Sequence, residues 1–210
     1  MANKNRKAQM QQANQAKAKQ KQYDAATKNL FIFPCIALGL SVLLLLLFFV
    51  TFSDVYNTET KSLEFKVNGW TYFAAGLVGN YSSVEWAGGF LAVPFYKFAE
   101  EWVEAVGTLT VITVFVALFN LIIQLVTVLK KFNGLNVVSA VMSLATSILL
   151  IVVMAKTIDM NNAKIISDYC GNPACEVRSC AIFPAIVAFG SCAVSGYAMV
   201  KNIQARYLLK

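Results

Sequence analysis

Apolar residues along this chain gather into four long runs rather than into the periodic stripes of amphipathic helices. The runs cover residues 30–52, 105–129, 135–155 and 181–200, and none of them contains a charged residue. About 20 consecutive apolar residues are enough for a helix to cross the roughly 30 Å hydrocarbon core of a bilayer. The pattern therefore predicts an all-α membrane protein with a four-transmembrane-helix bundle. Its spans would be in direct contact with the lipid bilayer.

The segment between the first two runs has a different pattern. Apolar and polar residues alternate over residues 62–68, SLEFKVN, which predicts a half-buried strand, and Asn68-Gly69 is a dipeptide typical of a hairpin turn. Residues 86–104 are rich in aromatic residues, which suit the membrane–water interface. We therefore expect a small β element and then an interfacial helix that leads into the second span.

Aromatic residues of this first outer loop have two interpretations. They anchor the loop at the interface and fill its core, or they form an outer-loop interface for a neighbouring subunit. The candidates for that interface are Trp70, Trp86, Phe95 and Trp102.

Charges predict the orientation. Residues 1–29, the link at 130–131 and the C-terminal tail together carry twelve basic residues and one acid, whereas loops 53–104 and 156–180 carry six basic residues and ten acids. Basic residues collect on the cytoplasmic side of membrane proteins. We expect a multi-pass protein of the cell membrane with both termini cytoplasmic, organised as a basic N-terminal segment (1–29) and one four-helix domain (30–210).

Within the predicted spans the polar residues are neutral. The second span carries a polar face, which either bonds across the bundle or lines a pore between subunits. Small residues on the third and fourth spans recur at spacings that let helices pack closely. The polar face comprises Thr113, Asn120, Gln124 and Thr127, and the packing positions are Ser139, Ser143, Ser147, Gly190 and Gly196.

Several kinds of chemistry have no candidate residues. The chain contains no histidine, no Gly-rich phosphate loop and no paired carboxylates within a span. The basic N-terminal segment has only one aromatic residue, Tyr23, and so lacks a set of aromatic residues on which nucleic-acid bases could stack. We therefore expect no enzymatic activity, no metal, no cofactor and no nucleic-acid partner.

Three of the five cysteines, Cys170, Cys175 and Cys180, lie in the second outer loop. A non-cytoplasmic compartment favours disulfides over a thiolate metal site. Cys170 can close with Cys180, which we favour slightly, or with Cys175. The third cysteine is then unpaired or bonded to another chain.

The layout resembles that of the claudins: four spans, a first outer loop of about fifty residues with a strand pattern, a tight inner turn and a shorter second outer loop. Claudins carry a Trp, then Gly-Leu-Trp, then two cysteines in that first loop. Here Trp70 and Gly76-Leu77 are present, but no Trp follows Leu77 and the loop has no cysteine. The spacing in CGNPACEVRSC, with Pro173 before Cys175, is locally similar to the second outer loop of connexins.

The expected function follows from these patterns and from the claudin-like layout. We expect a non-enzymatic protein that acts through lateral assembly, as a homo-oligomer or with a partner membrane protein, in an accessory or structural role. The alternative is a homo-oligomeric large-pore channel lined by the neutral polar residues of the second span.

Overall fold

The computed structural model describes residues 2–27, 30–78, 100–130, 133–162 and 174–207. These residues are mostly helical with a little sheet, as the apolar runs and the alternating segment predict. The elements are α1 (Ala2–Thr27), α2 (Ile32–Leu47), β1 (Thr51–Asn57), β2 (Ser62–Asn68), α3 (Gly69–Val78), α4 (Glu100–Lys130), the 3-10 helix η3 (Asn133–Leu135), α5 (Asn136–Asn162), β3 (Cys175–Ser179) and α7 (Ile182–Tyr207).

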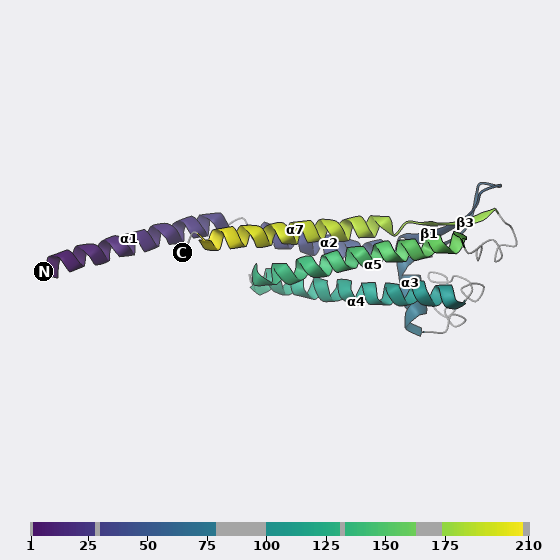
Figure 1. The fold of residues 1–210 in the computed structure, drawn as a ribbon, viewed down its shortest axis with the longest axis horizontal. Helices are drawn as coiled ribbons and strands as arrows, with labels where there is room; N and C mark the ends of the chain where they lie inside the picture. Colours follow the sequence, from purple (N-terminus) through teal and green to yellow (C-terminus); the bar gives the residue numbers. More distant parts are fainter. Residues whose placement is uncertain (1, 28–29, 79–99, 131–132, 163–173, 208–210) are drawn as a thin grey trace.

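Helices α2, α4, α5 and α7 lie side by side (Figure 1). Helix α5 contacts α4 and α7, and α2 contacts the same two helices, so the four close a ring of contacts. By length and composition, Ala105–Lys130 in α4, Asn136–Asp159 in α5 and Ile182–Ala205 in α7 are long and apolar enough to cross a membrane. Helix α2 has 16 residues and is about 24 Å long at ~1.5 Å per residue, which is shorter than these three.

Helix α2 ends before the apolar run that contains it. The amides of Phe48, Phe49 and Val50 donate to carbonyls three residues earlier, at 3.0–3.3 Å, so the last turn tightens after Leu47. The β-branched and aromatic residues that follow favour extended backbone. The chain therefore enters β1 at Thr51, inside the stretch whose apolar character predicted only a helix.

Both loops at one end of the bundle contribute to a single sheet of three antiparallel strands, in the order β2-β1-β3. Strand β2 is the segment predicted by alternation. Ser53 of β1 lies opposite Ser179 of β3, and the amide of Cys180 donates to the carbonyl of Phe52 at 2.7 Å. The segment between α2 and α4 is thus tied directly to the segment between α5 and α7.

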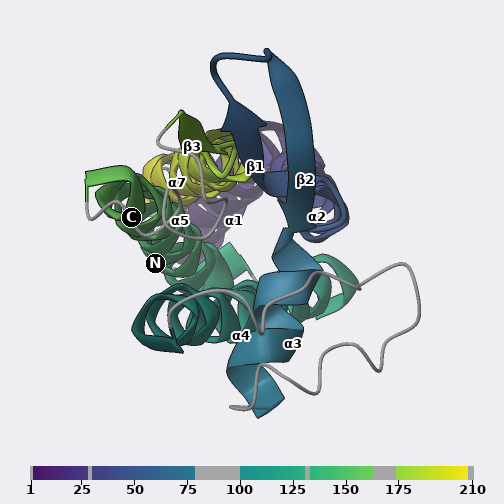
Figure 2. The ribbon, with the colours of Figure 1, turned by 90° about the vertical axis from the view of Figure 1, so that its right-hand side faces the viewer.

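Asn68-Gly69 does not turn a hairpin. The Asn68 side-chain oxygen accepts hydrogen bonds from the amide and the hydroxyl of Thr71, both at 2.8 Å, which is the arrangement of a helix N-cap. Helix α3 begins at Gly69 as a consequence and crosses α4 beneath the sheet (Figure 2). The interfacial helix expected over 86–104 falls mainly outside the described residues, and α4 begins within it at Glu100.

Helix α1 and the end of α7 lie at the end of the bundle opposite the sheet (Figure 1). The described side chains of α1 are exposed except that of Tyr23, which is half-buried, so α1 is a solvated basic helix with a small contact to α7.

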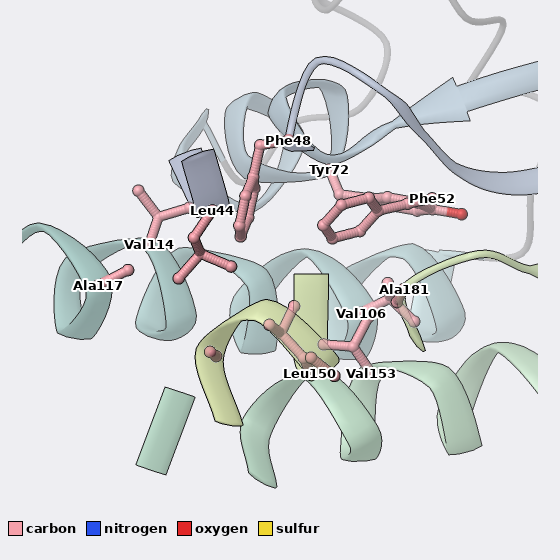
Figure 3. Close-up of a cluster of buried hydrophobic side chains, with 12 residues drawn as sticks. Leu44, Phe48, Phe52, Tyr72, Val106, Val114, Ala117, Leu150, Val153 and Ala181 are labelled. Atoms are coloured by element: carbon pink, nitrogen blue, oxygen red, sulfur yellow. The ribbon is translucent and has the colours of Figure 1, made fainter. Parts of the chain in front are cut away.

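The largest apolar cluster lies at the sheet end of the bundle, where β1 and α3 meet the four helices (Figure 3). Phe48, Phe52 and Tyr72 are its largest members, and each has at most 1% of its surface exposed. They pack against small and branched residues from α4, α5 and α7, including Val106, Leu150 and Ala185. The three-stranded sheet and the bundle therefore share one core.

Candidate functional site

All four residues of the predicted polar face of α4 are buried inside the bundle. Thr113, Asn120, Gln124 and Thr127 each have 2% or less of their surface exposed. The hydroxyls of Thr113 and Thr127 donate at 2.7 Å to the carbonyl four residues earlier in α4, so their hydrogen-bond donors are satisfied within their own helix. The two amides make their hydrogen bonds to other helices.

Asn120 and Gln124 bond to serines of two neighbouring helices. The Asn120 amide nitrogen donates to the Ser143 hydroxyl at 2.8 Å. The Gln124 amide nitrogen donates to Ser139 at 2.9 Å and to Ser191 at 3.0 Å. One side chain of α4 therefore joins α5 to α7.

The serine hydroxyls continue these bonds to each other. Ser143 donates to Ser191 at 3.2 Å, Ser139 and Ser195 share a bond of 3.2 Å, and Ser191 lies 3.5 Å from the Ser41 hydroxyl of α2. We call this connected set the polar cluster, and it includes residues from all four helices. Its members are Ser41, Asn120, Gln124, Ser139, Ser143, Ser191 and Ser195.

The third predicted packing serine lies at the next level of the bundle. The Ser147 hydroxyl donates at 3.0 Å to the carbonyl of Ala185, which brings α5 and α7 together there. The predicted glycines do not make close contacts. A Cβ on Gly190 would reach only the Leu40 side chain, at 3.8 Å, and one on Gly196 would meet nothing within 4 Å.

The closest glycine contact was not among the predicted positions. A Cβ on Gly76 of α3 would lie 2.4 Å from the carbonyl carbon and oxygen of Gly107 in α4, which is far inside van der Waals contact. Neither glycine has a small residue four positions before or after it in the sequence, so neither segment shows the repeated small-residue spacing. The close approach becomes apparent only when α3 and α4, whose glycines are about thirty residues apart in the sequence, are packed together.

The surface of the bundle has the opposite character to its interior. Between Ile112 and Leu129, each turn of α4 exposes large apolar side chains, while the polar side chains of this stretch are buried. Such an arrangement suits a bundle surrounded by lipid, where a polar group on the outside would lack partners. The exposed positions on α4 are Ile112, Phe115, Phe119, Ile122, Leu125, Val126 and Leu129.

Of the predicted outer-loop interface residues, the structure places only the side chain of Trp70. Its ring packs against Phe48, Phe49 and Phe73, with centroid distances of 5.5–5.8 Å, so it forms part of the junction between loop and bundle. Trp86 and Phe95 lie outside the described residues. Trp102 is in α4, but its side chain is not described.

The cysteine triplet coincides with β3. Cys175 begins the strand and Cys180 follows its last residue, so at ~3.3 Å per residue their Cα atoms are roughly 16 Å apart. A disulfide needs Cα atoms within about 7 Å, so these two cysteines do not bond to each other within one chain. Cys170 lies outside the described residues, and its closure with Cys175 or Cys180 stays a prediction.

Tyr72 provides a test of how α3 is anchored to β1. Its hydroxyl donates to Ser53 of β1 at 3.0 Å, and burial raises its pKa well above the ordinary range, an effect that the Ser53 bond partly offsets. The folded state therefore keeps the neutral phenol, whereas an unfolded tyrosine ionises near pH ~10. We expect stability to be unaffected by this group below pH ~10 and to fall as the pH rises further.

Denaturation of wild type and Tyr72→Phe between pH 7 and pH 11 measures this effect. The variant loses about 1 kcal/mol at neutral pH, because one buried hydrogen bond is removed. Its stability then falls less steeply above pH 10 than that of wild type. Parallel pH profiles for the two proteins would contradict the assignment.

No protein-family model matches the chain, and comparison with curated proteins and with solved structures finds no significant match.

Proposed function

We propose that the chain is a non-enzymatic, four-span membrane protein with a claudin-like layout that acts through lateral assembly, with itself or as an accessory subunit of a partner membrane protein. The observation that carries the proposal is the sheet shared by both outer loops. Because β1 pairs with β2 and with β3, and because this sheet shares a core with the bundle, it forms a preformed surface held rigidly at one end. Such a surface suits the binding of another protein more than the catalysis of a reaction.

The fourth span in this proposal is α2. Its helix alone is short, but the tightened turn after it and the two apolar residues before it extend the apolar segment from Leu30 to Val50. Twenty-one residues cover about 31 Å at ~1.5 Å per residue, close to the thickness of a hydrocarbon core. With four spans, the charge distribution puts both termini in the cytoplasm and the sheet outside.

The neutral interior also bears on the channel alternative. A pore between subunits needs polar residues on the outer surface of each bundle. Asn120 and Gln124 instead bond to serines of their own chain, and the exposed side of α4 is apolar. This arrangement supports the assembly proposal over a pore lined by Thr113, Asn120 and Gln124.

Assembly is measured on protein extracted directly into lipid nanodiscs, without detergent, and sized under non-reducing conditions. We expect a particle with more than one copy of the chain, or one copy with a second membrane protein. Arg178→Glu on β3, whose guanidinium lies 4.5 Å above the Tyr56 ring, should reduce the assembled fraction. Lys201→Glu is the matched control, because its ammonium lies over the Tyr197 ring, 5.5 Å from the centroid, on α7, near the end of the bundle opposite the sheet.

A sharply monomeric species with no companion protein would contradict the proposal. Single-channel recording on the reconstituted protein separates it from the alternative. We expect no steady conductance, and a conductance that changes in Asn120→Leu would show that the polar face lines a pore.

A further inference from the structure

The polar cluster contains two acceptors without a partner among the described residues. Asn120 Oδ1 and Gln124 Oε1 are both fully buried and unbonded, although the nitrogen of each amide is bonded within the cluster. Asn120 and Gln124 are 2% and 1% exposed. A buried carbonyl oxygen that accepts no hydrogen bond is rare in folded proteins and is usually explained by a bound water or ion.

The serine hydroxyls do not supply the missing donors. Each hydroxyl has one hydrogen, and four of the five serine hydrogens in this cluster are directed at other hydroxyls or at the backbone. The fifth belongs to Ser139 or Ser195 and could supply at most one of the two oxygens, neither of which accepts a bond from it. Ser143 donates to Ser191, Ser139 and Ser195 share one bond, and Ser191 lies 3.5 Å from both Ser41 and the carbonyl of Ala37. The serines therefore cannot supply donors to both amide oxygens, and the structure shows neither oxygen bonded.

The placement of Asn120 and Gln124 four residues apart on α4 suits one small molecule that contacts both side chains. Residues four apart on a helix have Cβ atoms about 5–6 Å apart on the same face. A molecule that donates to both oxygens at about 2.8 Å spans a similar distance. Water has two donors, and its oxygen can accept a hydrogen bond from an amide of the cluster, which gives it the three partners typical of a buried water.

We infer that the polar cluster is a hydration site, in which one water molecule donates to Asn120 Oδ1 and Gln124 Oε1 at the centre of the bundle. A cation would also suit two carbonyl oxygens. Within Ala105–Lys130, Asn136–Asp159 and Ile182–Ala205, however, the charged residues lie only toward the ends, so none balances a cation at the cluster. An unpaired charge in a low-dielectric interior is strongly disfavoured. Water supplies the donors without that penalty.

Solid-state NMR on the full chain in lipid bilayers tests the site by transfer of magnetisation from water to side-chain carbons. We expect the Gln124 side-chain carbonyl carbon to receive water magnetisation several-fold faster than the methyl groups of Leu150, which is 0% exposed in the apolar cluster. The side chain of Gln20, on the exposed helix α1, gives the rate of transfer expected for a fully hydrated amide. The signal of Gln124 is identified by its loss in Gln124→Met.

Variants then separate this site from other sources of water. Asn120→Leu removes one of the two acceptors, so transfer to Gln124 should slow several-fold. Thr127→Val is the matched control, because that buried hydroxyl bonds to Ile123 of its own helix and lies outside the cluster. Transfer to Gln124 should be unchanged in this variant.

Three results would overturn the inference. Transfer to Gln124 as slow as transfer to Leu150 would mean a dry cluster. Equally fast transfer to Val114 and Ala117, which lie on α4 toward the apolar cluster, would mean an aqueous pore. A Gln124 carbonyl shift that depends on replacing Na⁺ by choline would mean an ion rather than water.

Discussion

Replacing Gly76 by alanine should detach α3 from α4 and lower the free energy of unfolding by about 2–4 kcal/mol. The added Cβ would lie 2.4 Å from the Gly107 carbonyl carbon and oxygen, and backbone atoms cannot rotate away as a side chain does. Helix α3 must then move, and it carries Tyr72 and Trp70, which fill the junction between sheet and bundle. Unfolding of the purified protein in mixed micelles, followed by circular dichroism, measures the loss.

Two glycine variants control for this prediction. Gly107→Ala probes the same contact from the other helix, where the new Cβ would lie 3.0 Å from Gly76, and should also destabilise. Gly39→Ala on α2 adds the same methyl group where nothing lies within 4 Å, so it should not reduce stability. Equal losses for Gly76→Ala and Gly39→Ala would mean that the close contact between α3 and α4 does not exist.

Ser191→Leu should be comparably severe, with a loss of about 3 kcal/mol. Ser191 lies where the hydroxyls of α2, α5 and the amide of α4 meet, and it is 1% exposed. A leucine there overpacks the meeting point of four helices and removes one of the two acceptors of the Gln124 amide. Interhelical hydrogen bonds in membranes are worth about 0.6 kcal/mol each on average, so most of the loss should come from packing.

Ala193→Leu is the matched control for this variant. It places the same side chain on the same helix two residues later, on the exposed face of α7. We expect no loss of stability there. Ser191→Ala then isolates the hydrogen-bond contribution, and a Ser191→Ala loss as large as that of Ser191→Leu would contradict the packing explanation.

The sequence predicted those parts of the fold that depend on local composition. Uncharged apolar runs predicted α4, α5 and α7, because length and hydropathy are sufficient for a long apolar helix. The alternation in SLEFKVN predicted β2 for the same reason. The polar face of α4 followed from helical spacing, which brings Asn120 and Gln124 onto one side.

Contacts between distant segments were not predictable. Strand β3 is five residues long and is formed by antiparallel pairing with β1. In the sequence, 117 residues separate Asn57 from its partner Cys175, so no local pattern predicts this pairing. Asn68-Gly69 satisfies the requirements of a hairpin turn and of a helix N-cap equally well, and only the packing of α3 against α4 decides between them. The serines that complete the polar cluster likewise become partners only once three other helices surround α4.

The place of β3 in the sheet also determines when the protein can finish folding. Strand β1 is made early, but its second partner follows only after α4 and α5. At ~5–20 residues per second, the edge of β1 that β3 later covers stays open for roughly 6–24 s during synthesis. An open strand edge is a template for pairing with the wrong chain. This edge of β1 therefore closes only when Cys175–Ser179 has been synthesised and has paired with it.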